Sequence, residues 1–194
     1  RLGATEVRFV NEPAFADIIA GGRKPWDIAL AEVSISRKRE ANVDFSRPYL
    51  DVDQGILMAK GARNPPRTRA DVRGLDLCAL RQTTGGSLAR RLNPATELFL
   101  TRPELMQALQ GLACAAVMDD APVLGTERRA LPDRYGGIAG RVRTGERYGV
   151  VLPEGSALRA DVDAALAAME ADGTLAKLQR RWLTTNVKRV RELR

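Results

Sequence analysis

Short apolar runs that alternate with helical patterns are the feature that most limits the fold of this chain. Leu75–Leu80 is a mostly apolar run of strand length, and Ser87–Leu92, which follows a turn, has the pattern of a helix. The run from Leu112 to Asp119 is again followed by a helical pattern. Strands that alternate with helices are typical of a parallel sheet with helical crossovers. The sequence therefore predicts an α/β protein.

The same alternation extends toward both ends of the chain. Ser36 precedes a short helical pattern and is a residue type that caps helices. Residues 156–169 have an apolar stripe at helical spacing. We expect strands or extended segments at 7–10, 26–34, 55–60, 98–100 and 141–153, and helices at 13–21, 36–41, 103–110, 120–127, 156–169, from 174 onward, and in a last turn within 187–194.

Two α/β halves joined by two extended segments predict a bilobed protein. We expect two Rossmann-like lobes with a ligand cleft between them, because ligands of such sheets bind beyond the carboxyl ends of the strands. Residues 1–55 are expected to form the N-terminal part of the first lobe, and residues 56–147 the second lobe. Residues 148–194 are expected to return to the first lobe with the C-terminal helices.

The composition excludes several kinds of site. The 194 residues include no histidine, which excludes His-based triads and His metal ligands, and two cysteines are too few for a zinc cluster. No metal and no cofactor is therefore expected. The net charge of +7 comes from arginines scattered among acidic residues, and only 5% of residues are aromatic. We expect a solvated basic surface and no nucleic-acid partner.

Polar residues follow three of the expected strands. The stretch from Ser34 to Arg39 combines a hydroxyl, the N–H groups of a helix start and a guanidinium, which suits a carboxylate. The stretch Arg81–Ser87 places hydroxyls and glycines at a helix N-terminus, which also favours an anion. Asp119 ends a buried run and could pair with an ammonium group. Each has a purely structural alternative: a surface arginine behind a capping serine, a capped turn, and a helix N-cap.

An anion site on one lobe and an acid on the other together suit a zwitterion such as an amino acid. Four stretches carry a family resemblance: DIALAEVSISRKREANVDFSRPY, LCALRQTTGGS, ACAAVMDD, and YGVVLPEGSALRADVDAALAAMEADGTLAKLQRRWL. In this order they resemble the polar amino-acid binding proteins, family 3 of the bacterial extracellular solute-binding proteins. The resemblance covers nearly the whole chain and implies the type II periplasmic binding protein fold.

The resemblance implies a role for each matching position. Arg39 would bind the α-carboxylate of the ligand, with help from the N–H and hydroxyl of Ser34. Thr83 would add a hydrogen bond from the second lobe, and Asp119 would hold the α-ammonium. With their neighbours, the expected ligand-binding residues are Arg39, Ser34, Thr83, Asp119, Glu32, Gln82 and Thr84.

The chain departs from the family pattern in three places. Glu32 stands where a small residue is usual, and it could favour a cationic ligand, point away, or pair with Arg39. Gln82 replaces a glycine, which we expect to alter the backbone that faces the carboxylate. The family's first strand and first helix have no counterpart, so roughly 30–50 residues, with a signal peptide in the precursor, are expected before Arg1.

The implied function is non-catalytic. A binding protein of this family would capture an amino acid by cleft closure outside the cytoplasm and deliver it to an ABC transporter permease. We expect a monomer, periplasmic or extracellular, with a lipoprotein anchor as one option. The alternatives are an enzyme on the same scaffold, such as a cyclohexadienyl dehydratase with Glu32 as its acid, and the sensor domain of a receptor.

The two cysteines allow two states. Cys78 lies five residues before Thr83, and Cys114 lies five before Asp119. If those strands are parallel neighbours, the cysteines are level and about 5 Å apart. A cross-strand disulfide would suit an oxidising compartment. We favour two buried thiols, because a bridge between paired strands is strained.

Overall fold

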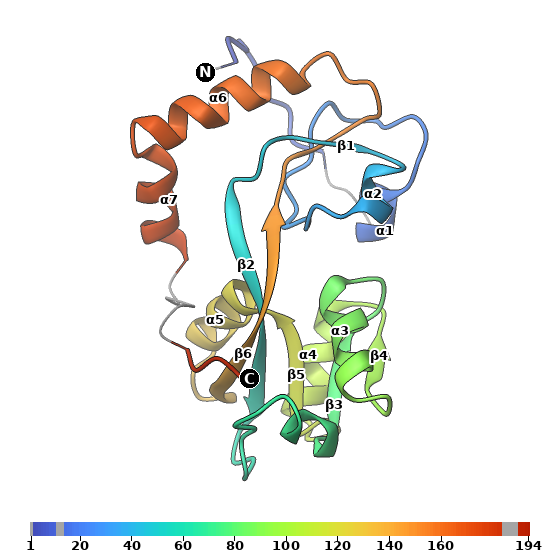
Figure 1. Ribbon diagram of the computed structural model, residues 1–194, viewed down its shortest axis with the longest axis vertical. Coiled ribbons are helices and arrows are strands. Elements are labelled where there is room, and N and C mark those ends of the chain that lie inside the picture. The colour runs from blue at the N-terminus through green and yellow to red at the C-terminus, as the bar shows by residue number, and fades with distance from the viewer. Residues whose placement is uncertain (1, 11–13, 184–189) are drawn as a thin grey trace. The chain divides into compact units, whose positions relative to one another are not determined.

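The computed structural model describes residues 2–10, 14–183 and 190–194 (Figure 1). The chain divides into two compact units. Unit 1 comprises Arg1–Asp51 and Glu146–Arg180, and unit 2 comprises Val52–Gly145 and Arg181–Arg194. The chain passes between the units within strand β2 (Leu50–Ala59), strand β6 (Tyr135–Tyr148) and helix α7 (Thr174–Trp182).

Unit 2 is built on a five-stranded sheet with the order β4-β3-β5-β2-β6. Strand β3 (Leu77–Leu80) pairs in parallel with β4 (Glu97–Phe99) and with β5 (Ala116–Asp120), and β5 pairs with β2 in the antiparallel direction. Helices α3 (Thr84–Leu92), α4 (Arg102–Gln110) and α5 (Ala121–Ala130) alternate with these strands. The expected α/β class and parallel strands are confirmed.

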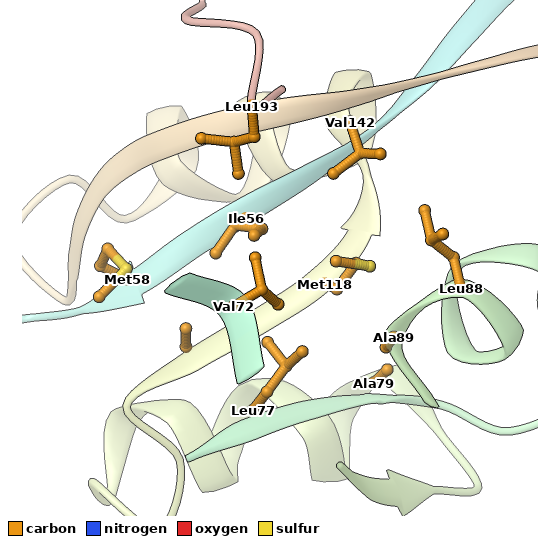
Figure 2. Packing of buried hydrophobic residues seen from close by; sticks show 11 residues of the cluster. Ile56, Met58, Val72, Leu77, Ala79, Leu88, Ala89, Met118, Val142 and Leu193 are labelled. Carbon is orange, nitrogen blue, oxygen red and sulfur yellow. The ribbon is translucent and has the colours of Figure 1, made fainter. Parts of the chain in front are cut away.

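One face of this sheet is covered mainly by α3 and the 3-10 helix η1 (Asp71–Gly74). Ile56 of β2 and Met118 of β5 point to this face, and Val72 of η1 packs against them (Figure 2). The other face is covered by α4 and α5, through side chains such as Leu105 and Leu124. Because successive strand residues alternate between two buried faces, the strands read as continuous apolar runs.

Unit 1 has less regular structure. Strands β1 (Asp44–Phe45) and β7 (Val151–Leu152) form an antiparallel pair. Helices α1 (Phe15–Ile19), α2 (Arg37–Glu40), α6 (Arg159–Ala171) and most of α7 complete it. Val151 packs in a cluster with Ile18 and Val33, whereas Leu152 packs with Val162 and Leu166 of α6, so the strand pair is buried on both sides.

Two strands expected in unit 1 are wrong. Residues 7–10 have no regular structure, and Phe9 is 92% exposed. Residues 26–34 make only isolated bridges, from Ala29 to Val151 and from Ser34 to Tyr148. Glu32, between them, has a φ of 56°, which a continuous strand cannot accommodate. The helix expected at 13–21 is α1, although Pro13 lies outside the described residues.

The C-terminal tail also differs from the expectation of a helical turn in the first lobe. Residues 187–189 lie outside the described part. Glu192 bridges to Arg141 of β6 in the parallel direction, and Leu193 is fully buried against Gly140. The tail therefore adds an extended segment to the sheet of unit 2.

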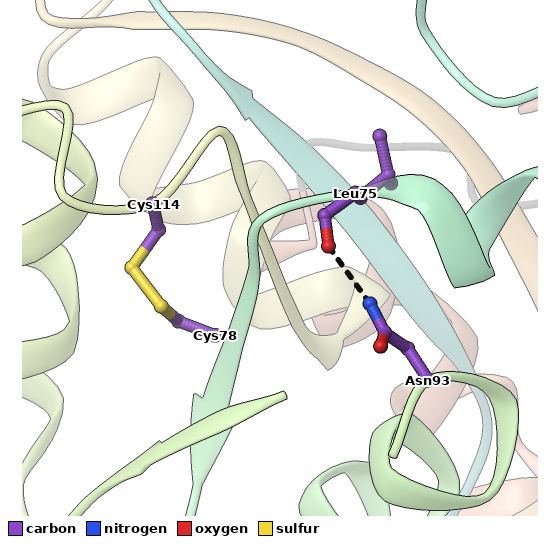
Figure 3. Close-up of a disulfide and its surroundings, with 4 residues drawn as sticks. All are labelled: Leu75, Cys78, Asn93 and Cys114. Atoms are coloured by element: carbon purple, nitrogen blue, oxygen red, sulfur yellow. Dashed lines mark hydrogen bonds between the residues drawn. A yellow bond between two sulfur atoms is a disulfide. The ribbon is translucent and has the colours of Figure 1, made fainter. Parts of the chain in front are cut away.

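Cys78 and Cys114 form a disulfide (Figure 3), so the preference for two free thiols was wrong. The register pairs Cys78 with Val117, and Cys114 lies before the start of β5. The bridge therefore joins β3 to the loop before β5, with 6.0 Å between the two α-carbons. Strain is expected of a bridge between level cysteines on two paired strands, and that arrangement does not occur here.

Candidate functional site

Arg39 is held inside unit 1 by the short helix α2. Ser36 caps this helix, because its hydroxyl accepts a hydrogen bond from the Arg39 N–H at 3.4 Å. The guanidinium donates from Nη1 to the Ser34 carbonyl at 2.7 Å and lies 5.1 Å from the ring centroid of Phe15. Arg39 is only 7% exposed, so the explanation as a surface arginine does not hold. A buried guanidinium in fixed orientation can bind a carboxylate through two N–H groups.

Ser34 lies beside Arg39 and is also buried. Its hydroxyl donates to Oε2 of Glu146 at 2.8 Å. Glu146 is on β6 and was not among the expected site residues. The antiparallel bridge from Ser34 to Tyr148 brings the two segments together, and no local sequence signal reports this contact.

Glu32 is exposed and lies near Tyr49 in the same unit. Burial, and to a smaller extent the negative charge of Glu32, raises the pKa of Tyr49 from 10.0 to about 12. The electrostatic influence of Glu32 therefore reaches Tyr49, which packs with its ring centroid 6.2 Å from that of Tyr148.

The loop after β3 has a defined backbone. Gln82 adopts a φ of 62°, the left-handed conformation that glycine favours. Gln82 therefore adopts a conformation that is also open to glycine, and its effect on the backbone that faces a carboxylate stays a prediction. Thr83 caps α3: its hydroxyl accepts from the Gly86 N–H at 2.9 Å and donates to the Leu80 carbonyl at 2.9 Å. Thr84 is the first residue of α3.

Asp119 lies at the carboxyl end of β5 and is 4% exposed. Its Oδ1 accepts a hydrogen bond from the Asp120 N–H at 2.9 Å. Its Oδ2 lies 3.4 Å from Nη2 of Arg102, the first residue of α4. Asp120, not Asp119, occupies the N-cap position of α5, so the capping explanation does not apply to Asp119.

The structure brings the expected residues of unit 2 together. Because β3 and β5 are parallel neighbours, the loop of Gln82, Thr83 and Thr84 and the carboxylate of Asp119 lie at the same edge of the sheet. A Cβ placed on Gly85 of α3 would lie 3.6 Å from the α-carbon of Asp119, so the first turn of α3 directly adjoins Asp119. Within unit 1, Ser34 and Arg39 form the corresponding pair. Arg102 was missed, because its contact with Asp119 depends on how α4 packs.

The family can now be assigned. The sequence pattern of the bacterial extracellular solute-binding proteins, family 3, matches residues 1–185. The chain belongs to this family. Among the residues that the structure describes, no helix is long and apolar enough to cross a membrane.

Named proteins that resemble the chain agree with this assignment. The chain is 27% identical over 161 residues, 81% of its length, to the ABC transporter glutamine-binding protein of Bacillus subtilis, and it spans 58% of that protein. It is 26% identical to the arginine-, lysine-, histidine-binding protein ArtJ of Geobacillus stearothermophilus, with a TM-score of 0.70 over 82% of this chain and 70% of that one. The ligand-binding core of GluR0 in complex with L-glutamate, 23% identical, shares the fold with a TM-score of 0.77, covering 91% and 81% of the two chains.

Proposed function

We propose that this family 3 protein binds an amino acid, without catalysis, for delivery to an ABC transporter permease. The observation that carries the proposal is the presence of a buried Arg39 in unit 1 and a buried Asp119 in unit 2. Arg39 supplies a positive charge with several N–H donors, and Asp119 supplies a negatively charged acceptor. An α-amino acid offers a carboxylate to the first residue and an ammonium to the second.

Arg39 and Ser34 bind the α-carboxylate in this proposal. Arg39 supplies planar N–H donors, which suit two-pronged binding of a carboxylate. Ser34 contributes its N–H. Its hydroxyl is oriented by the hydrogen bond to Glu146, and the Arg39 guanidinium is oriented by the hydrogen bond to the Ser34 carbonyl. In unit 2, the backbone N–H groups at Thr84 and the start of α3 favour a negatively charged group, because a helix N-terminus carries a partial positive charge.

Asp119 and Thr83 bind the α-ammonium in this proposal. Asp119 supplies the negative charge from the end of β5. The Thr83 hydroxyl already donates to the Leu80 carbonyl and accepts from Gly86. A hydroxyl oxygen has a second lone pair, so Thr83 acts toward the ligand as an acceptor. An ammonium group is the part of an amino acid that donates to such an oxygen.

The family and the disulfide support a location outside the cytoplasm and a membrane partner. The family is extracellular, and the bridge between Cys78 and Cys114 is of a kind that persists in oxidising compartments. Relatives such as the glutamine-binding protein of Bacillus subtilis are named as parts of ABC transporters. We therefore propose a protein outside the cytoplasm that meets a membrane permease; that it is a monomer stays a prediction.

Isothermal titration calorimetry with the twenty amino acids tests the proposal. We expect tight binding of one or a few of them, lost by at least about 100-fold in Arg39→Ala and in Asp119→Ala, because each variant leaves a charged ligand group without its partner. Circular dichroism and thermal melting confirm that both variants fold. A folded wild-type protein that binds no amino acid would refute the proposal, and a dehydratase assay with Glu32→Gln would then test the enzymatic alternative.

A further inference from the structure

The charge of the chain is divided unequally between the two units. Unit 2 contains 19 Lys and Arg residues and 10 Asp and Glu residues, which gives a net charge of +9. Unit 1 contains the other 12 basic and 14 acidic residues, which gives a net charge of −2. Because these counts include every acidic side chain, the ion pairs within unit 2 are already accounted for, and its excess of positive charge remains.

Part of this excess lies where helix α5 meets the C-terminal tail. Arg128 and Arg129, in the last turn of α5, line the same surface pocket as Val190 of the tail. Nε of Arg128 donates to the Gly136 carbonyl at 2.8 Å, which orients the side chain and leaves its charge in place. Both arginines are exposed, so a partner can reach them.

The other end of the tail adds further arginines. The Arg69 N–H donates to the Arg194 carbonyl at 3.1 Å, and Nη2 of Arg69 donates to the Arg143 carbonyl at 3.4 Å. Glu192 lies in the tail and pairs with Arg194 at 3.6 Å, so it compensates part of the charge. The exposed arginines that adjoin the tail or lie in it form a group that we call the tail cluster: Arg69, Arg128, Arg129, Arg143, Arg191 and Arg194.

The residues of unit 2 favour an extended anionic surface over a shaped macromolecular partner. Protein interfaces depend on aromatic or apolar anchors, and sites for single-stranded nucleic acid depend on exposed aromatic rings that stack on bases. Phe99, Tyr135 and Trp182 are the aromatic residues of unit 2, and of these Trp182 alone, on α7, is exposed. The tail cluster contains only arginines, whose guanidinium groups bind phosphate oxygens through pairs of N–H donors.

We propose that the tail cluster is an interaction surface for anionic phospholipid head groups, through which unit 2 binds a bilayer surface. Phospholipid is the phosphate-bearing surface that a protein of an extracellular family meets at a membrane. Attraction to such a surface falls off within the Debye length, about 8 Å at physiological salt, so the residues that face the lipid determine binding. The inference goes beyond the proposed function, because it does not depend on amino-acid binding.

Co-sedimentation with lipid vesicles at about 150 mM salt tests the inference. We expect the wild-type chain to bind vesicles with about one-third phosphatidylglycerol at least about 10-fold more tightly than vesicles of phosphatidylcholine alone. Arg128→Gln with Arg129→Gln, and Arg191→Gln with Arg194→Gln, should each weaken this binding by at least about 5-fold.

The matched control removes the same amount of charge from another part of unit 2. Arg90 and Arg91 are exposed in the last turn of α3, which leads to β4 at the opposite edge of the sheet from β6. Arg90→Gln with Arg91→Gln should change vesicle binding by less than about 2-fold, because these side chains lie outside the tail cluster. Thermal melts show that every double variant folds.

Four results would overturn the inference. They are no binding to anionic vesicles at about 150 mM salt, equal binding to neutral vesicles, an equal loss in the control and in the cluster variants, and tighter binding to duplex DNA than to vesicles at equal phosphate concentration. The last result would identify nucleic acid as the preferred polyanion. Amino-acid titration of the same proteins reports on the proposed function separately, so failure of one proposal leaves the other testable.

Discussion

The main-chain carbonyl of Leu80 lies so close to the α-carbon of Gly86 that a Cβ at Gly86 would overlap it. The same carbonyl accepts the Thr83 hydroxyl at 2.9 Å. This contact joins the end of β3 to the first turn of α3 and sets the path of the loop between them. The loop carries Gln82, Thr83 and Thr84, so its geometry affects the proposed ligand site.

Gly86→Ala should destabilise the protein by about 2 kcal/mol, because the new methyl group must displace backbone rather than a flexible side chain. Equilibrium denaturation in urea measures the change. Gly74→Ala is the control, since a Cβ there meets nothing within 4 Å, and its effect should stay within about 0.5 kcal/mol. Equal stability of wild type and Gly86→Ala would show that the β3–α3 turn is more open than described.

Arg39→Lys should keep the fold but weaken amino-acid binding by at least about 10-fold. Lysine retains the positive charge, yet it offers a point charge in place of the planar guanidinium that binds a carboxylate in two-pronged fashion. Arg37→Lys on the same helix is the control, because Arg37 is exposed and should leave affinity unchanged. Calorimetry measures the amino-acid affinity of both variants. An equal loss of affinity in both would show that the overall positive charge of α2, not the buried guanidinium, determines binding.

Alkaline pH should destabilise the protein through Tyr49. Its pKa is raised from 10.0 to about 12 in the folded state, so its stabilising contribution is complete below pH 10 and is lost as the pH rises toward 12. At pH 11 wild type should have lost about 1 kcal/mol more than Tyr49→Phe, which cannot ionise. Denaturation curves at pH 8 and pH 11 measure the difference. A parallel loss in both proteins, or a phenolate absorbance change of Tyr49 centred near pH 10, would contradict the prediction.

Reduction of the disulfide should lower the free energy of unfolding by about 3–4 kcal/mol, because the bridge closes a loop between cysteines separated by 36 residues. Denaturation with and without dithiothreitol measures this, with Cys78→Ser plus Cys114→Ser as the matched variant that should not respond to the reductant. Thiol titration of the unfolded, unreduced protein should detect no free thiol. Two thiols before reduction would disprove the bridge.

The regular elements of unit 2 were predictable from sequence, because strands buried on both faces leave continuous apolar runs, as in β3 and β5. Helix caps were also predictable from sequence: Ser36 caps α2, as expected. The strands expected at 7–10 and 26–34 failed for the same physical reason. An apolar run forms a strand only where a neighbouring segment pairs with its backbone, and the left-handed φ of Glu32 interrupts the second run.

The sequence predicted the candidate site residues that follow strand ends, but not the residues whose contacts depend on tertiary packing. The expected positions of Thr83 and Asp119 at one sheet edge follow from parallel pairing of β3 and β5. Arg102 at the start of α4 contacts Asp119, and Glu146 on β6 contacts Ser34, and both contacts depend on the tertiary structure. The disulfide was misjudged because the register of β3 and β5, offset relative to the cysteines, cannot be read from spacing alone.

The burial of Leu193 matters for protein engineering. Leu193 is fully buried against Gly140, and the Arg69 N–H donates to the Arg194 carbonyl at 3.1 Å. A fluorescent reporter fused directly after Arg194 would therefore be joined to a segment fixed on the sheet of unit 2. A biosensor based on this protein would need a flexible spacer at that junction, and trimming the last two residues to shorten the linkage would remove a side chain from the hydrophobic core.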